Sequence, residues 1–123
     1  MTEDEIRSNL EKLESCFYEN TGRVMPKYFR FPEGRYDERT ISILNDLGYK
    51  SFFWSLAYAD WDDNKQPNSS YAVNTLVKNT HPGAIILLHP TSRCNAEILP
   101  TLIEKWLDMG YTFETLDKLV ENK

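Results

Sequence analysis

The feature that most constrains the fold of this chain is a run of four apolar residues followed by a histidine and a proline. Ile85 to Leu88 are apolar, Gly83 precedes the run, and His89 and Pro90 follow it. A short apolar run bounded on both sides is typical of a buried parallel strand. Functional side chains of α/β proteins gather at the carboxyl ends of such strands. His89 is therefore either a functional residue or a histidine that binds a nearby backbone group.

Helical and extended patterns alternate along the rest of the chain. Apolar residues at helical spacing and short apolar or aromatic runs predict these elements. The expected helices cover about residues 2–20, 37–47, 69–78, 95–109 and 115–120, and the expected further strands cover 28–31, 51–56 and 111–113. Such alternation predicts a parallel sheet with right-handed crossovers, so the expected fold class is α/β with about four parallel strands. Residues 1–123 form one domain or one contiguous part of a domain.

Charge and hydropathy limit the partners of the chain. Its net charge is −5 over 123 residues, and no basic tract is visible, which argues against nucleic acid as a partner. No apolar stretch is long enough for a transmembrane helix. The acidic start, Met1 to Glu5, lacks the basic and apolar regions of a signal peptide. Either the protein is cytoplasmic or the chain begins downstream of a targeting segment, so its localisation stays open.

Residues that could bind a metal are few and far apart. Cys16 and Cys94 lack the spacing of a zinc site and are expected to be free thiols. His81 lies eight positions before His89, which is roughly 26 Å along an extended strand. A metal site with two histidines is therefore not expected within this chain, and His81 is interpreted as a turn residue.

Polar and aromatic side chains follow three successive expected strands. They are Arg30 with the turn at 31–34, then Asp60 with Trp61, then His89. Parallel strands bring these positions to one edge of the sheet. A carboxylate beside His89 favours the imidazolium and suits a general acid. Each residue alone could be an ion pair, a turn former or a core residue, but together they indicate a functional site.

These same stretches resemble three motifs of a known family. Arg30-Phe31-Pro32-Glu33-Gly34, Phe53-Trp54-Ser55 to Asp60-Trp61, and Leu87-Leu88-His89 are similar to the last three motifs of polysaccharide deacetylases. These are the NodB-homology enzymes of carbohydrate esterase family 4. The likeness is greatest to the delta-lactam-biosynthetic de-N-acetylases of spore-forming bacteria. It covers essentially the whole chain, through Thr21-Gly22, Asp46 to Lys50, Asn95-Ala96-Glu97 and Gly110-Tyr111.

The resemblance implies an incomplete (β/α) barrel that hydrolyses N-acetyl groups of aminosugars in a peptidoglycan-like glycan, with a divalent metal, often zinc, in the complete domain. It implies catalytic roles for three residues: His89 as the general acid, Asp60 as its partner, and Arg30 as the residue that orients a catalytic-base aspartate. It also implies substrate contacts: Leu87 at the acetyl methyl, Trp61 beside the sugar groove, and the backbone near Glu33 at the oxyanion.

Two family motifs are absent from this sequence. They are the aspartate pair of a Thr-Phe-Asp-Asp strand end and the His-Ser/Thr-x-x-His metal pair, which belong upstream of Met1. Residues 1–123 are therefore expected to be a C-terminal half whose N-terminal half is missing, with no metal bound by this chain alone and little or no activity. The alternative is an inactive half-domain that binds glycan or a partner. Open sheet edges would also allow a homodimer.

Overall fold

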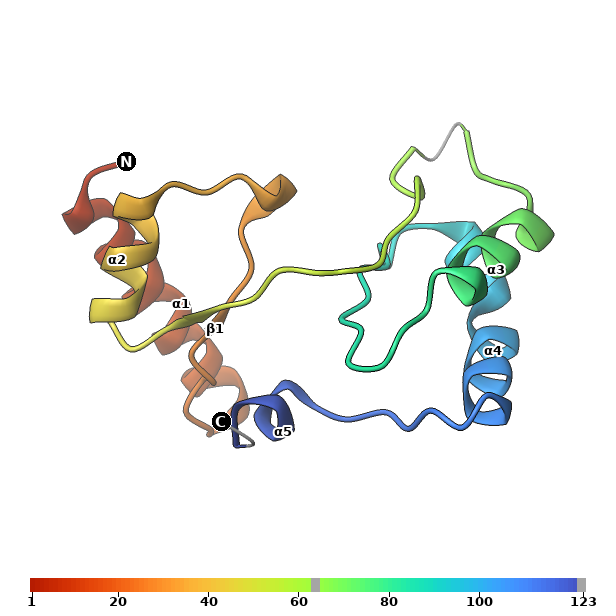
Figure 1. The fold of residues 1–123 in the computed structure, drawn as a ribbon. Coiled ribbons are helices and arrows are strands. Elements are labelled where there is room, and N and C mark those ends of the chain that lie inside the picture. The colour runs from red at the N-terminus through yellow and green to blue at the C-terminus, as the bar shows by residue number, and fades with distance from the viewer. Residues whose placement is uncertain (63–64, 122–123) are drawn as a thin grey trace. The chain divides into compact units, whose positions relative to one another are not determined.

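A computed structural model describes residues 1–62 and 65–121 of the chain. The chain divides into two compact units, Met1–Phe53 and Trp54–Lys123, and each is described by itself (Figure 1). The first unit contains α1 (Glu3–Thr21), β1 (Tyr28–Phe29), the 3-10 turn η1 (Pro32–Gly34), α2 (Glu38–Asp46) and β2 (Lys50–Ser51). The second contains α3 (Ser69–Lys78), α4 (Arg93–Asp108) and α5 (Leu116–Glu121).

Capping residues set both ends of α1. Thr2 Oγ1 accepts the Glu5 N–H at 3.1 Å, and the Glu5 carboxylate accepts the Thr2 N–H at 2.6 Å. This reciprocal box satisfies two amides that the first helical turn leaves without partners. Gly22 follows with a φ of 70°, in the left-handed conformation that commonly ends helices. The helix predicted from the spacing of its apolar residues is confirmed.

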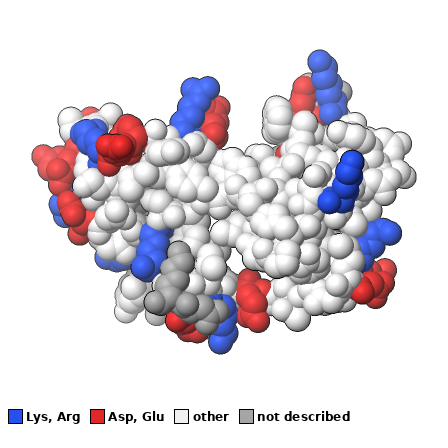
Figure 2. Space-filling model, viewed as in Figure 1, with Lys and Arg blue, Asp and Glu red and all other residues white. Residues whose placement is uncertain are grey.

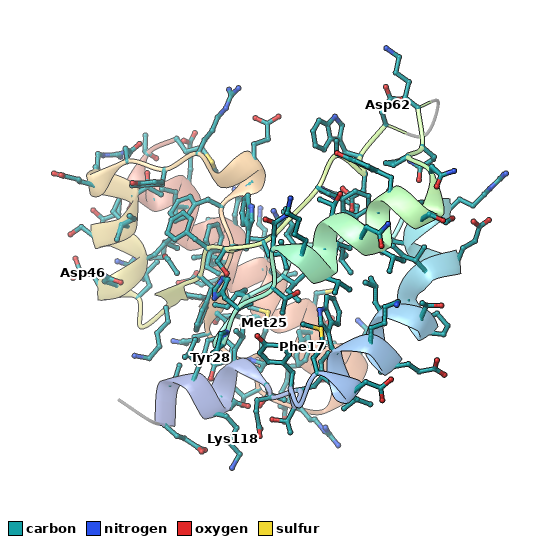
Figure 3. All side chains as sticks on the ribbon, turned by 45° about the vertical axis from the view of Figure 1, so that its right-hand side comes forward. Phe17, Met25, Tyr28, Asp46, Asp62 and Lys118 are labelled. Carbon is teal, nitrogen blue, oxygen red and sulfur yellow. The ribbon has the colours of Figure 1, made fainter. Side chains whose placement is uncertain are left out.

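The first unit is built on a parallel strand pair joined by a helix. In β1 and β2, Tyr28 pairs with Lys50 and Phe29 with Ser51, while α2 forms the connection between the two strands. The Phe52 N–H extends the pairing to the Phe29 carbonyl at 2.8 Å. Met25 packs against the buried core of this unit (Figure 3), whose members are Leu10, Phe31, Leu44 and Tyr49.

The second unit places two extended segments against a pair of packed helices. Leu56 and Ile86 form a parallel bridge, with the Leu87 N–H bound to the Leu56 carbonyl at 2.9 Å. Helices α3 and α4 pack together beside these segments. Ile86 and Leu88 pack against the buried core of the unit, whose members come from the Leu56 segment and both helices: Leu56, Tyr58, Ala72, Val73, Leu76, Cys94, Ile98, Leu102 and Trp106.

Three details of the sequence prediction are corrected. Residues 111–113 form no strand, because the described residues offer them no ladder partner, and the Tyr111 N–H instead binds the Trp106 carbonyl at 3.0 Å. The expected strands at 28–31 and 51–56 contract to the paired residues of β1 and β2 and to the bridge at Leu56, and the buried strand expected at 85–88 contracts to the partner of that bridge, Ile86, in a half-buried segment. Helix α4 begins at Arg93 rather than at about 95, since Ser92 caps it.

Charges of both signs are mixed over the surface seen in Figure 2, without a broad basic area on that face. Ion pairs on helices include Arg7 with Glu3 at 3.4 Å and Lys118 with Glu121 at 3.7 Å. None of the helices in the described ranges is long and apolar enough to cross a membrane.

Candidate active site

Asp60 and His89 form a close pair in the second unit. The His89 ring Nδ1 lies 2.6 Å from Asp60 Oδ1, and the His89 backbone N–H donates to Asp60 Oδ2 at 2.8 Å. The Asp60 side chain is 1% exposed, whereas that of His89 is 36% exposed. One carboxylate therefore holds both the ring and the main chain of a histidine that stays accessible.

The surroundings of Asp60 keep it ionised. Burial on its own raises the pKa of Asp60. The hydrogen bonds from the His89 N–H, the Asn95 amide and the His89 ring, together with the attraction of the His89 charge, outweigh burial and hold the pKa below its ordinary value. Because an ionised carboxylate can only accept, His89 Nδ1 carries a proton in this pair. Nε2 is then the nitrogen that remains for another group.

A simple alternation of side chains explains why Asp60 is buried. Leu56, Tyr58 and Asp60 are buried, while Ala57 and Ala59 between them are exposed. Side chains of an extended segment alternate between two faces, so Asp60 lies on the face that carries core residues. The sequence Leu-Ala-Tyr-Ala-Asp shows this alternation, which was available as a signal before the structure.

The structure adds four polar residues around the pair that sequence reasoning did not assign to the site. The Asn95 amide donates to Asp60 Oδ2 at 2.6 Å, and the Tyr58 hydroxyl donates to Asn95 Oδ1. Ser92 and Gln66 form the next layer, with Ser92 Oγ donating to Gln66 Oε1 at 2.7 Å. The only available sequence signal was the similarity at Asn95-Ala96-Glu97, which indicated no role for Asn95.

Trp61 and Leu87, predicted to contact substrate, belong to the same unit as the pair. Trp61 follows Asp60 directly and is 66% exposed. Leu87 is half-buried two positions before His89, and its N–H is bound to the Leu56 carbonyl. Their predicted roles in substrate binding stay predictions.

Arg30 and Glu33 belong to the first unit and are described there. Arg30 is exposed directly after β1. Glu33 has a φ of 58°, and it is the non-glycine residue in the described ranges that adopts the left-handed conformation. Its carboxylate pairs with Arg35 Nε at 3.2 Å, and both side chains are exposed. The orienting role of Arg30 and the oxyanion role near Glu33 stay predictions.

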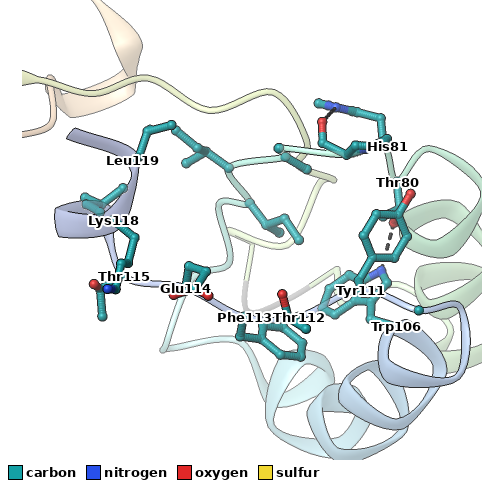
Figure 4. Close-up of a pocket in the computed structure, with 17 residues that line it drawn as sticks. Thr80, His81, Trp106, Tyr111, Thr112, Phe113, Glu114, Thr115, Lys118 and Leu119 are labelled. Atoms are coloured by element: carbon teal, nitrogen blue, oxygen red, sulfur yellow. Dashed lines mark hydrogen bonds between the residues drawn. The ribbon is translucent and has the colours of Figure 1, made fainter. Parts of the chain in front are cut away.

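A separate cavity of about 470 Å³ lies elsewhere in the second unit (Figure 4). It is lined by the segment from Thr80 to Ile86, by Trp106 and by the segment that follows α4. Trp106 Nε1 donates to Thr80 Oγ1 at 2.8 Å, as the dashed line in Figure 4 shows. Neither Asp60 nor His89 lines this cavity, so it is distinct from their pair.

His81, interpreted from the sequence as a turn residue, binds its neighbours at that cavity. Its ring nitrogens lie 2.9 Å from Ser55 Oγ and 3.0 Å from the Pro82 carbonyl. In the described ranges, no three His, Cys, Asp or Glu side chains come together as a metal site. Cys16 and Cys94 are free thiols, as the sequence predicted.

Comparisons of the sequence identify its relatives. The family model described as polysaccharide deacetylase matches residues 1–52. The peptidoglycan-N-acetylmuramic acid deacetylase PdaA of Bacillus subtilis is 39% identical over 122 residues, which are 99% of this chain and 46% of that protein. An uncharacterized 30.6 kDa protein of Geobacillus stearothermophilus is 41% identical over 120 residues, covering 98% of this chain and 45% of that protein.

Solved structures agree with these relatives. The structure of Bacillus subtilis PdaA, a family 4 carbohydrate esterase, matches all of this chain and 53% of that chain, with a TM-score of 0.93 and 38% identity. A family 4 pseudoenzyme from Bacillus anthracis matches 91% of this chain and 38% of that chain, with a TM-score of 0.78 and 28% identity. The chain thus spans about half the length of its curated relatives and has the fold of a partial (β/α) barrel. It belongs to the polysaccharide deacetylases of carbohydrate esterase family 4.

Proposed function

We propose that this chain is the C-terminal half of a polysaccharide deacetylase domain and supplies the general acid for hydrolysis of N-acetyl groups on aminosugars. The observation that carries the proposal is the buried, ionised Asp60 bound to Nδ1 of His89 at 2.6 Å. This contact leaves Nε2 to act on a substrate. A histidine oriented in this way by a carboxylate is a suitable general acid.

The reaction needs a proton at the substrate nitrogen. Water adds to the acetyl carbon and gives a proton to the base from outside this chain. When the carbon–nitrogen bond breaks, the amine must receive a proton to leave. The His89 imidazolium, held at Nδ1 by Asp60, donates this proton from Nε2. The products are acetate and the free amine of the sugar.

The substrate class follows from the relatives and the exposed residues of the site. The relatives include a peptidoglycan deacetylase of Bacillus subtilis and a chitooligosaccharide deacetylase of Azorhizobium caulinodans, which supports an N-acetylated glycan as substrate. Trp61 offers an exposed indole to a sugar ring, and Leu87 lines the space for the acetyl methyl. The backbone N–H near Glu33 is proposed to bind the oxyanion.

The metal and the base are proposed to come from outside this chain. The described residues do not fit a divalent metal, because no three potential ligands converge. The complete domain is expected to use zinc or a similar cation, which would polarise the acetyl carbonyl. Arg30 is proposed to orient the base that the other half supplies.

The experiment joins this chain to the part of Bacillus subtilis PdaA that it does not match and measures acetate release from N-acetylated glycan with zinc. We expect the chimera to be active, its His89→Ala variant to lose about 10²- to 10⁴-fold in rate, and the isolated chain to release no acetate. An active isolated chain would refute the proposed division of labour. A His89→Ala chimera as active as its parent would refute the general acid.

A second function, glycan or partner binding without catalysis, is favoured by the likeness to the Bacillus anthracis pseudoenzyme. It predicts an inactive chimera and glycan binding that survives His89→Ala and needs no metal.

A homodimer is also proposed, since β1, β2 and the Leu56 bridge pair with single neighbours in the described ranges. Sedimentation that shows a monomer at high concentration would exclude the homodimer.

A further inference from the structure

We infer that Asn95 is a positioning residue that holds the Asp60 carboxylate and the His89 main chain together, and thereby fixes which nitrogen of neutral His89 carries the proton. The inference rests on the proposed function, because it concerns the same pair. It goes further by assigning a role to Asn95, whose side chain binds Asp60 and the main chain of His89.

Every polar atom of the Asn95 side chain has a partner. Its amide nitrogen donates to Asp60 Oδ2 at 2.6 Å and to the His89 carbonyl at 3.0 Å, and its oxygen accepts from the Tyr58 hydroxyl. The two acceptors of the amide cannot donate, so they fix the orientation of the side chain. The residue is 6% exposed, so water does not replace these bonds. Asn95 therefore connects the carboxylate directly to the backbone of the histidine.

No other side chain can make the same three bonds from this position. Aspartate has the shape but no N–H groups, and it would place a second carboxylate against Asp60. Leucine has similar size but leaves the Asp60 oxygen, the His89 carbonyl and the Tyr58 hydroxyl without this partner. Glutamine has the same groups on a longer stem. The site thus requires an asparagine on chemical grounds.

The start of α4 holds Asn95 in place. Ser92 Oγ accepts the Asn95 N–H at 3.1 Å, which sets Asn95 at the third position of the helix. Gln66 Oε1 accepts from Ser92 Oγ and from the Cys94 N–H, while Gln66 Nε2 donates to the Asp60 carbonyl at 3.2 Å. The start of α4 is therefore connected to Asp60 twice, once through Gln66 and once through the Asn95 side chain.

The titratable groups around Asn95 are Asp60, His89, Tyr58 and Cys94. Burial, followed by the neighbouring Cys94, raises the pKa of Tyr58 above its ordinary value. The phenol therefore keeps its proton at neutral pH and continues to donate to Asn95. Tyr58→Phe removes this anchor but leaves both amide donors of Asn95, which makes it a milder test than any change at Asn95 itself.

The test measures the tautomer of neutral His89 by nitrogen NMR on the 123-residue chain labelled at histidine. His81→Gln assigns the signals, since the chain has two histidines. In the parent we expect the Nδ1–H form to dominate. In Asn95→Leu the ratio of Nδ1–H to Nε2–H should fall about tenfold, the equivalent of one hydrogen bond, and in Tyr58→Phe it should fall less. Asn74→Leu, at an exposed position of α3, should leave it unchanged.

Activity of the chimera separates this inference from the proposed function. Asn95→Leu should lower kcat about 10- to 100-fold with little change in KM, because the substitution displaces the general acid but leaves the groups that bind the substrate unchanged. If His89→Ala abolishes activity while Asn95→Leu changes neither the tautomer nor kcat, the positioning role is refuted and the general acid stands. If Asn95→Leu does not fold, an unchanged tautomer ratio in Tyr58→Phe refutes the positioning role.

Discussion

Replacement of Asp60 by asparagine should strongly destabilise the unit formed by residues 54–123. The side chain keeps its shape and burial but loses its charge. The carboxylate accepts three hydrogen bonds, from the His89 N–H at 2.8 Å, from His89 Nδ1 at 2.6 Å and from the Asn95 amide at 2.6 Å. The new amide has one oxygen to accept with, and its NH₂ group must face one of these donors.

The expected cost can be worked from these contacts. A buried donor left without a partner costs about 1–3 kcal/mol, and a hydrogen bond to a charged group contributes about 1.5–3 kcal/mol against about 1 kcal/mol for a neutral one. One lost bond and two weakened bonds give about 3 kcal/mol near neutral pH. The pKa of Asp60 is lowered on folding, so its contribution is complete above the unfolded pKa of about 3.9 and is lost as the pH falls through the folded pKa. The cost should therefore shrink in acid.

Urea unfolding followed by tryptophan fluorescence measures this cost. Trp54, Trp61 and Trp106 all lie in the second unit, so the signal reports that unit alone. Asp108→Asn, the same chemical change at an exposed position of α4, is the matched control and should cost less than about 0.5 kcal/mol. A cost for Asp60→Asn below about 1 kcal/mol near neutral pH, or one that does not change in acid, would show that the carboxylate does not hold the site.

Three further predictions concern packing, strain and thiol access. Leu102 of α4 is fully buried, so its replacement by alanine should lower the free energy of unfolding by about 3 kcal/mol. The same replacement of Ile103, which is 37% exposed, should lower it by less than about 1 kcal/mol, and urea unfolding measures both. Glu33→Gly should raise the stability of the first unit by about 0.5–1 kcal/mol in thermal unfolding followed by circular dichroism, since glycine adopts a positive φ without strain; an unchanged or lower stability would contradict this. A thiol reagent should modify exposed Cys16 in the native chain and buried Cys94 only after unfolding, and equal rates would contradict the packing.

The helices were the most predictable part of the fold, because their signals are local. The capping box at Thr2 and Glu5 and the glycine at position 22 mark both ends of α1 within a few residues. Strand lengths were less predictable. A ladder depends on a neighbour from a distant part of the chain, and neither residues 51–56 nor residues 111–113 carry information about whether that neighbour is present.

The candidate site was predictable in part. Asp60 and His89 could be expected near each other because both follow extended segments that run in parallel. The role of Asn95 could not, because serine and asparagine are both common helix caps, so either Ser92 or Asn95 could have begun α4. Ser92 forms the cap, which frees the Asn95 side chain to reach Asp60. A choice between two capping residues one helical turn apart is decided by tertiary contacts that no local pattern contains.

The hydrogen-bond network around His89 supports the division of labour proposed above. The groups that hold His89, namely Asp60, Asn95, Tyr58, Ser92 and Gln66, all belong to residues 54–123 and bind one another there. Preorganisation of the acid therefore does not depend on a metal or on the base. Arg30 and Glu33 act, on the proposed function, toward groups that the other half supplies. On the proposed function, the other half would supply the metal and the base to an acid pair that residues 54–123 already hold in place.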